Sequence, residues 1–260
     1  MTEQAAQGWL ELVKIMRQLR SKNGCPWDKE QTHHSLKRYL LEESYEVLDA
    51  IDTADDKALC DELGDVLLQV VFHAQIAAEE GRFSIEDVLE NVNSKMKRRH
   101  PHVFGESSIA DSREVLTQWE AIKADEKTTL GAKRQIMKLN DNLPALLLAQ
   151  KVQDKAGRVG FDWPDISGPW QKVYEELEEL KQAENHNEQC NELGDTIFAL
   201  VNLARFLKAD AEDNLRHSIK KFVARFNYIE NCLAESRQKW EEKTLAELDA
   251  LWEEAKMSGL

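Results

Sequence analysis

The chain has 260 residues, with 34 Lys or Arg against 48 Asp or Glu, which gives a formal net charge of −14. A surface with this much negative charge repels phosphate backbones and anionic lipid. We therefore expect neither nucleic acid nor a membrane as a partner. The four cysteines have neither disulfide nor zinc spacing, and no apolar segment reaches the roughly 20 residues of a membrane span. These features favour a cytoplasmic protein with one large domain or two of ordinary size.

Segments rich in leucine, alanine and charged residues, with a 3.6-residue apolar period, predict a protein made entirely of α-helices. In the first half, Asn23-Gly24 and Gly81 end helices, and Ser84-x-x-Asp87 is a capping box that begins another. The helices expected in this half cover residues 9–20, 36–51, 56–80, a stretch from 84 onward, and 114–124.

The second half begins after residues 125–142, whose Thr-Thr-Leu-Gly sequence and scattered charges are typical of a linker. A last helix begins at the capping box Thr244-x-x-Glu247. The helices expected before it cover residues 144–156, 169–184, 188–208 and 211–236. We therefore expect an all-α fold with two tandem helical-bundle domains, 1–124 and 143–260, joined by the linker.

Short sequence features recur in the two halves in the same order, which indicates an internal duplication. The most similar pair is Cys-Asp-Glu-Leu-Gly-Asp at 60–65 and Cys-Asn-Glu-Leu-Gly-Asp at 190–195. The other pairs are 24–28 with 160–164, 41–48 with 174–181, Lys95-x-x-x-Arg99 with Lys221-x-x-x-Arg225, and 118–123 with 251–256.

Two acidic pairs in the second half occupy matching positions on consecutive helices. Because a helix turns about 100° per residue, Glu176 and Glu179 flank the apolar stripe of one helix. Glu192 and Asp195 flank the stripe of the next helix on the same rotational side. Two antiparallel helices would bring the four carboxylates together at the edge of a bundle core. The equivalent first-half residues are Glu43, Glu46, Glu62 and Asp65.

The recurrence of these carboxylates favours a metal site. An isolated Glu-x-x-Glu is usually a solvated helix face, but here two acidic pairs occur together in both halves. Four adjacent carboxylates repel one another unless a cation is present. A ligand set of oxygen atoms alone suits Mg²⁺ or Mn²⁺ better than zinc or copper. Gly64 and Gly194 lie between the acidic residues, so we expect a neighbouring helix or a ligand to approach the backbone there.

A pair of cations on one helix also recurs. Lys221 and Arg225 are four residues apart, and the same spacing is found in the first half. Such pairs usually belong to a solvated surface, but the recurrence favours phosphate binding. Trp119 and Trp252 have two open interpretations, a core anchor or the lining of a nucleotide pocket.

The motif Glu-Glu-x-x-Glu at 175–179, followed by Glu-x-x-Asp at 192–195, resembles the signature of the all-α nucleoside triphosphate pyrophosphohydrolases. The segments Asn-Gly-Cys-Pro-Trp-Asp, Arg-Arg-His-Pro-His-Val-Phe and Val-Gly-Phe-Asp-Trp are similar to those of the MazG-type members, and the resemblance covers essentially the whole chain. It implies Mg²⁺-dependent hydrolysis of nucleoside triphosphates to nucleoside monophosphate and pyrophosphate. It also implies broad base tolerance and helical domains that pair as dimers.

The resemblance assigns roles to individual residues of the second half. The catalytic metal ligands would be Glu176, Glu179, Glu192 and Asp195. The nucleotide would be bound by Lys172, Glu176, Asp195, Lys221, Arg225 and Trp252. Tyr39 stands where the second half has Lys172, and losing a cation from a triphosphate site favours the second half as the main catalytic unit.

The expected substrate is a ribo- or deoxyribonucleoside triphosphate, and the expected partner is a second copy of the chain. Two alternatives stay open. One is a narrower enzyme, restricted to one deoxynucleotide or to damaged nucleotides. The other is a non-catalytic, nucleotide-binding dimeric regulator. Pyrophosphate release from a panel of nucleotides in the presence of Mg²⁺ would separate all three.

Overall fold

The computed structural model describes residues 2–105, 111, 114–115, 118–119, 121–123, 126, 137 and 143–260. Every regular element in these residues is a helix, so the predicted all-α fold is confirmed. The chain divides into two compact units, Met1–Ala132 and Lys133–Leu260. The division falls inside residues 125–142, most of which lie outside the described residues, so the linker and the domain bounds stay predictions.

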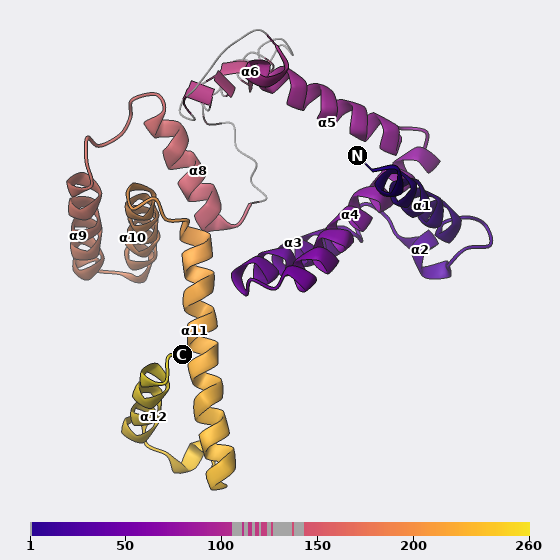
Figure 1. Cartoon of the computed structure of the whole chain (residues 1–260). Helices are drawn as coiled ribbons and strands as arrows, with labels where there is room; N and C mark the ends of the chain where they lie inside the picture. Colours follow the sequence, from indigo (N-terminus) through magenta and orange to yellow (C-terminus); the bar gives the residue numbers. More distant parts are fainter. Residues whose placement is uncertain are drawn as a thin grey trace. The chain divides into compact units, whose positions relative to one another are not determined.

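The first unit is organised around a long helix, α4 (Asp56–Glu79). α3 (Lys37–Asp52) lies beside α4 along its first half, as Figure 1 shows. α1 (Glu3–Leu19) and α5 (Ile85–Arg99) also contact α4. The buried core beneath these helices consists of Met16, Leu36, Val71, Phe72, Ala74, Ile76 and Ile85.

The ends of these helices follow from local chemistry. The Ser84 amide donates to Asp87 Oδ2 at 2.7 Å and the Asp87 amide donates to Ser84 Oγ, which confirms the predicted capping box of α5. α4 ends before Gly81, whose φ of 67° is in the left-handed region that favours glycine. The predicted end of this helix is therefore confirmed as well.

Two short helices of the first unit, α2 (Pro26–Glu30) and α6 (Pro101–Phe104), are not indicated by the apolar period. Four or five residues are too few to show a 3.6-residue repeat. Each begins at a proline, whose fixed φ suits the first turn of a helix and whose missing N–H is not needed there.

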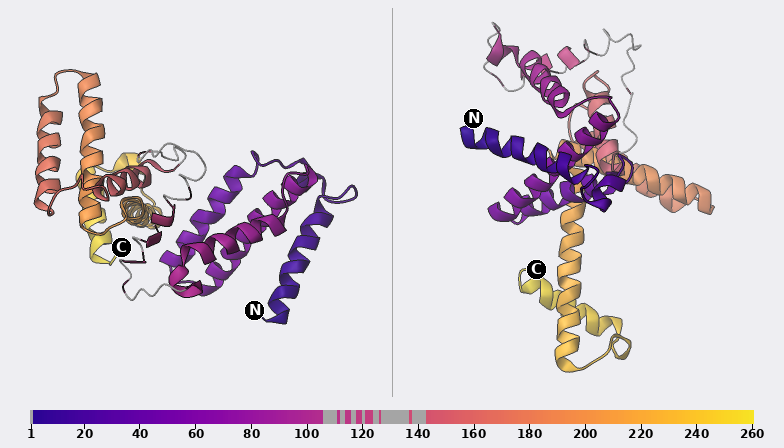
Figure 2. Two further views of the ribbon diagram at one scale, coloured as in Figure 1. Left: turned by 90° about the horizontal axis from the view of Figure 1, so that it is seen from above. Right: turned by 90° about the vertical axis from the view of Figure 1, so that its right-hand side faces the viewer.

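The second unit contains a helical hairpin and a long helix. α9 (Ser167–Gln182) and α10 (His186–Phe206) lie side by side, and α8 (Ala145–Gly157) packs against α10. α11 (Ala211–Ser236) is a single extended helix, and α12 (Leu245–Met257) folds back along its far end after the 3₁₀ turn η1 (Trp240–Glu242) (Figure 2).

The second unit also begins its last helix as expected, since Thr244 and Glu247 form a capping box at α12. The observed helices begin and end within a few residues of the bounds expected for them, except α1, which begins at Glu3 instead of near Trp9. The helix expected at 114–124 lies partly outside the described residues, so its bounds stay a prediction. No helix in the described part of the chain is long and apolar enough to cross a membrane.

Candidate functional site

The α9–α10 hairpin brings the predicted carboxylates of the second unit together. Glu176, Glu192 and Asp195 each have a carboxylate oxygen within 4.8 Å of the others. Glu179 forms an overlapping group with Glu175 and Glu176 at the same distance limit. The helical spacing explains this arrangement, because residues three apart lie on one face and the two helices run beside each other.

Glu176 is the most buried member of this group, with 5% of its surface exposed. Its Oε1 lies 2.5 Å from Lys172 Nζ, one helical turn earlier, and Lys172 Nζ also lies 2.7 Å from Glu175 Oε1. Hydrogen bonds to Glu175 and Glu176 raise the pKa of Lys172, so its ammonium is charged at neutral pH. A cation suited to a phosphate oxygen therefore lies beside the carboxylates, and phosphate binding by Lys172 stays a prediction.

Charge repulsion inside the group is visible at Glu192. Partial burial, and then the negative charges of Glu179, Asp195 and Glu176, raise the pKa of the Glu192 carboxyl. A bound cation would relieve this repulsion. Because the donor set consists of carboxylate oxygens without His or Cys, Glu176, Glu179, Glu192 and Asp195 fit a hard cation such as Mg²⁺ or Mn²⁺.

A cavity of about 360 Å³ adjoins the carboxylates, within the size range of small-molecule sites. Lys172, Glu176 and Asp195 form part of its wall. The other wall residues come from α8, α10, the loop before α9 and Met137: Val152, Gln153, Ala156, Phe161, Asp162, Trp163, Phe198, Ala199, Asn202 and Arg205. The site thus combines an acidic group, a cation and an adjoining cavity whose wall is largely apolar.

The loop before α9 is held in place by two contacts that the sequence motifs do not reveal. Arg205 Nη2 lies 2.5 Å from Asp162 Oδ1, and the hydrogen bonds from Arg205 lower the pKa of Asp162. Trp163 lies against Gly168, where any Cβ would clash with the indole ring. Asp162 and Trp163 belong to the recurring Gly-Phe-Asp-Trp-Pro segment, whereas Arg205 has no such signal.

The first unit holds a second acidic group in the equivalent place. Glu43, Glu62 and Asp65 have carboxylate oxygens within 4.8 Å of one another. Burial and the charge of Asp65 raise the pKa of Glu43, and burial and the charge of Glu46 raise that of Glu62. All four predicted first-half carboxylates therefore lie close together.

The space beside the first acidic group differs from the cavity of the second unit. Counted along the recurring motifs, Trp27, Tyr39 and Phe72 correspond to Trp163, Lys172 and Asn202. These three aromatic rings pack on one another in the first unit: the ring of Trp27 lies 5.9 Å from that of Tyr39 and 6.5 Å from that of Phe72, both edge-on. Arg20 covers the Phe72 ring at 5.5 Å. Side chains thus meet in the first unit where their counterparts line a cavity in the second.

Sequence comparisons relate this chain to known proteins. A family model described as the MazG nucleotide pyrophosphohydrolase domain matches residues 31–104. A nucleoside triphosphate pyrophosphohydrolase/pyrophosphatase MazG of Thermotoga maritima is 50% identical over 95% of this chain and 94% of its own. The chain belongs to the MazG family. The predicted resemblance is therefore confirmed.

Two further relatives extend the comparison. A nucleoside triphosphate pyrophosphohydrolase of Escherichia coli K12 is 43% identical over 94% of this chain and 95% of its own. One of Mycobacterium tuberculosis is 34% identical over 90% of this chain and 62% of its own. The family model itself matches the first unit, so the first acidic group belongs to a MazG domain, and the choice of catalytic unit depends on the geometry.

In this MazG protein, the predicted phosphate-binding cations lie apart from the cavity. Arg225 Nε donates to the Leu260 carbonyl oxygen at 2.8 Å, and its guanidinium covers the Trp252 ring at 5.5 Å. Lys221, Arg225 and Trp252 are not among the described residues of the cavity wall. A single chain therefore does not bring them to the carboxylates.

The first unit repeats the same cation–aromatic contact. The Arg99 guanidinium covers the Trp119 ring at 5.7 Å, and Arg99 also lies 2.6 Å from Glu126. Both tryptophans thus pack against the second cation of the recurring pair, which accounts for their recurrence without a nucleotide.

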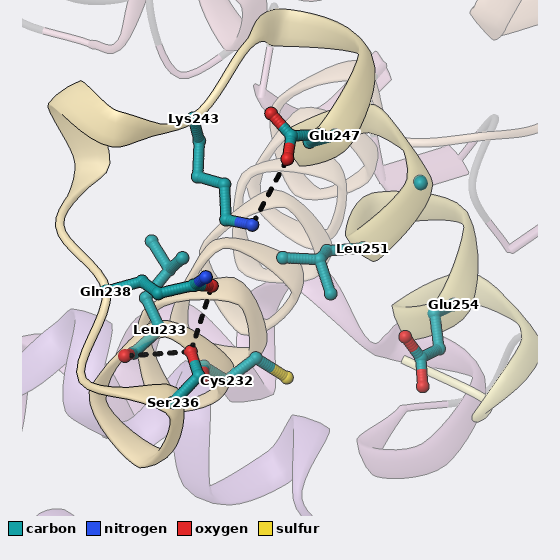
Figure 3. A pocket seen from close by; sticks show the side chains of 9 residues that line it. Cys232, Leu233, Ser236, Gln238, Lys243, Glu247, Leu251 and Glu254 are labelled. Carbon is teal, nitrogen blue, oxygen red and sulfur yellow. Dashed lines mark hydrogen bonds and ion pairs between the residues drawn. The ribbon is translucent and has the colours of Figure 1, made fainter.

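A second cavity, of about 420 Å³, lies between α11 and α12 (Figure 3). Its polar side chains are largely paired with one another: Lys243 lies 3.3 Å from Glu247, and Ser236 Oγ bonds to the Leu233 carbonyl and to Gln238. It contains none of the residues predicted for the metal or nucleotide site.

The two glycines between the acidic residues, Gly64 and Gly194, are in open space. No neighbouring atom lies within 4 Å of the position of an added Cβ at either one, in the part of the chain that the structure describes. The expected approach of a neighbouring helix is therefore wrong for the single chain, as far as the structure describes it. Approach of a ligand stays a prediction.

Proposed function

We propose that the second unit hydrolyses nucleoside triphosphates to nucleoside monophosphate and pyrophosphate, with Mg²⁺ as cofactor, Mn²⁺ as its substitute and broad tolerance of the base. The observation that carries this proposal is that the carboxylate group and Lys172 lie together in the wall of a cavity. The names of the relatives support the reaction class. The expected role is cleaning of the nucleotide pool.

Each residue of the group has a distinct part in this proposal. Glu176, Glu179, Glu192 and Asp195 would hold Mg²⁺. When bound, Mg²⁺ supplies neutralisation of phosphate charge and a water molecule of lowered pKa. Lys172, which already contacts two carboxylates, can exchange one of them for a phosphate oxygen. Carboxylate oxygens at fixed distances also orient the attacking water, and positioning and electrostatics contribute most of the rate in phosphate transfer.

We further propose that the enzyme works as a homodimer. α11 leaves a row of large apolar side chains exposed, and α10 does the same beside the carboxylates. The exposed residues of these two rows are Leu215, Ile219, Phe222, Val223, Phe226, Leu193, Ile197, Phe198 and Leu200. A second copy that covers them in a symmetric interface would bury this surface and could bring Lys221, Arg225 and Trp252 to a carboxylate group. Sedimentation should give a dimer at micromolar concentration, and a monomer there would contradict the proposal.

The other expected partners follow from charge. The net charge of −14 disfavours nucleic acid and anionic membranes, whereas the local cations and the metal serve a small anionic substrate. All four cysteines are free, which is in keeping with the proposed cytoplasmic location.

One specific observation favours a second role for the first unit. Because Trp27, Tyr39 and Phe72 meet beside its acidic group, that unit has less room for a nucleotide and lacks the lysine. We propose that it contributes mainly to structure or to regulation.

Pyrophosphate release from a panel of ribo- and deoxyribonucleoside triphosphates, with and without Mg²⁺, tests the proposal. Mg²⁺-dependent release from most of the panel is the expected result. Release from a single deoxynucleotide or a damaged one would point to the narrower enzyme, and binding without release would point to the regulator.

A further inference from the structure

The cavity of the second unit contains a buried hydrogen-bond acceptor without a partner. Gln153, on α8, has 7% of its surface exposed and forms part of the cavity wall. Its Nε2 donates to the Phe198 carbonyl oxygen at 2.8 Å, and its Oε1 has no hydrogen-bond partner in the described part of the chain. Buried polar groups are rarely left unpaired, and one in a cavity wall calls for a ligand atom.

The orientation of this amide is fixed by its neighbour. The Phe198 carbonyl can only accept a hydrogen bond, so the nitrogen of the Gln153 amide must face it and the oxygen must face away. The unpaired atom is therefore an acceptor, and it requires an N–H or O–H donor.

A second buried amide offers the complementary group. Asn202, on α10, has 6% of its surface exposed and also lines the cavity. Its Oδ1 accepts a hydrogen bond from Arg205 Nε at 3.0 Å, and Arg205 is held in turn by Asp162. Because the oxygen is used, and no bond from the Asn202 Nδ2 atom is found among the described residues, its N–H groups can donate to a ligand.

The two amides lie at a distance from the acidic group that suits a nucleoside. Asn202 follows Asp195 by seven residues on the same helix, which is two turns, or on the order of 10 Å. Lys172, Glu176 and Asp195 therefore occupy one part of the cavity wall and the amides another. The exposed rings of Phe161 and Trp163 add apolar surface to the same wall.

We propose that Gln153 and Asn202 bind the hydrogen-bonding edge of the nucleobase, with Gln153 Oε1 accepting from a base N–H. The inference rests on the proposed function, because it places the triphosphate at the carboxylates. Adenine, cytosine, guanine and uracil each carry an N–H donor on this edge. One acceptor can therefore serve all four, which gives a physical reason for broad base tolerance. A purine base without such a donor leaves Gln153 unpaired.

The test compares ATP with the triphosphate of unsubstituted purine riboside, which lacks the exocyclic amino group. In the wild-type enzyme, kcat/KM should be roughly tenfold lower for the purine analogue, since one hydrogen bond is lost and a buried acceptor stays unpaired. Gln153→Met removes the acceptor at similar volume, so ATP should fall to the level of the analogue and the ratio should approach one.

Gln150→Met is the matched control. Gln150 lies on the same helix one turn earlier, and both ends of its amide are bonded within the protein, to the Ala209 carbonyl oxygen at 3.1 Å and the Ala211 amide at 3.0 Å. Its replacement should lower the melting temperature and leave the ATP-to-analogue ratio at the wild-type value.

Two results would overturn the inference while the proposed function stands: equal kcat/KM for ATP and the analogue in the wild type, or an unchanged ratio in folded Gln153→Met. The comparison of ATP with the analogue in the wild-type enzyme tests the inference even if Gln153→Met does not fold. Hydrolysis of neither nucleotide would instead contradict the proposed function, and the inference with it.

Discussion

The α3–α4 and α9–α10 hairpins carry the same four carboxylates and differ in what lies beside them. In the first, Trp27 contacts Tyr39 and Phe72 edge-on. In the second, the corresponding side chains line a cavity of about 360 Å³. The two units thus share an acidic group and differ in the side chains beside it.

The acidic group and the cavity depend on different interactions, so one can be shared by the two units while the other is not. The carboxylates are placed by helical spacing within one hairpin, which any sequence of the right period preserves. The cavity depends on the volumes of side chains from α8, from α10, from the loop before α9 with α9 itself, and from Met137. A few substitutions, such as Phe72 in place of an asparagine, can close it while the helices stay unchanged.

The largest difference between the hairpins should appear when a carboxylate is neutralised. Asp195→Asn should lower kcat by on the order of 10²-fold or more, because a metal ligand loses its charge. Its melting temperature should stay the same or rise, because the change reduces repulsion among carboxylates. Asp65→Asn, the matched change in the first unit, should cost far less activity. Full activity of Asp195→Asn with normal Mg²⁺ dependence would refute the metal assignment.

The second cation of each recurring pair, Arg225 or Arg99, offers another comparison of the two units. Arg225→Ala should lower kcat/KM by roughly 10- to 1000-fold, because a guanidinium can hold a phosphate with two hydrogen bonds. Arg225→Lys should recover only part of this loss. Arg99→Ala, which disturbs the same cation–aromatic contact in the first unit, should change kcat/KM little. If none of the three variants changes kcat/KM in steady-state kinetics, these cations serve only the fold.

Filling the cavity of the second unit with an aromatic ring should weaken its binding of the nucleotide. Asn202→Phe introduces the first-unit residue and should raise KM for ATP by about tenfold, with some loss of stability from overpacking. Leu207→Phe adds a ring at the exposed end of the same helix and should change neither quantity. An unchanged KM in Asn202→Phe would show that the nucleotide does not enter this cavity.

The smallest effect concerns the ion pair that orders the loop before α9. Arg205 lowers the pKa of Asp162 in the folded state, so this stabilisation is present above the unfolded pKa of about 4 and is lost as pH falls through the lower folded value. Asp162→Asn should therefore destabilise the second unit by about 1 kcal/mol at pH 7. The difference in melting temperature from the wild type should shrink between pH 5 and pH 3. A constant difference would mean that the charge of Asp162 does not stabilise the loop.

Much of the fold could be predicted because its signals are local. The capping boxes at Ser84 and Thr244 and the glycine after α4 determine helix ends within a few residues. Helical spacing also predicted that Glu176 and Asp195 would lie close together. The apolar stripe expected to face the core on α10, Leu193, Ile197 and Leu200, is instead exposed in the single chain.

The remaining features depend on contacts between distant segments. Nothing in the sequence near Gln153 indicates that its amide meets the carbonyl of Phe198, 45 residues later. The position of Arg225 could not be predicted either, because the direction of α11 relative to α10 is set by side-chain packing and not by helical period. Sequence spacing placed Lys221 and Arg225 on one face of a helix but could not indicate which surface that face meets.

Two double variants test directly whether turnover occurs in the second unit, as we propose. Glu43→Gln with Glu46→Gln, and Glu176→Gln with Glu179→Gln, remove matched carboxylates from the two hairpins. Their Mg²⁺-dependent release of pyrophosphate from ATP should be measured together with sedimentation, to confirm that each variant keeps the oligomeric state of the wild type. The first-unit variant should retain most of the wild-type rate, and the second-unit variant should lose on the order of 10²-fold or more. Loss of turnover in a correctly assembled first-unit variant, with normal activity in the other, would contradict the account.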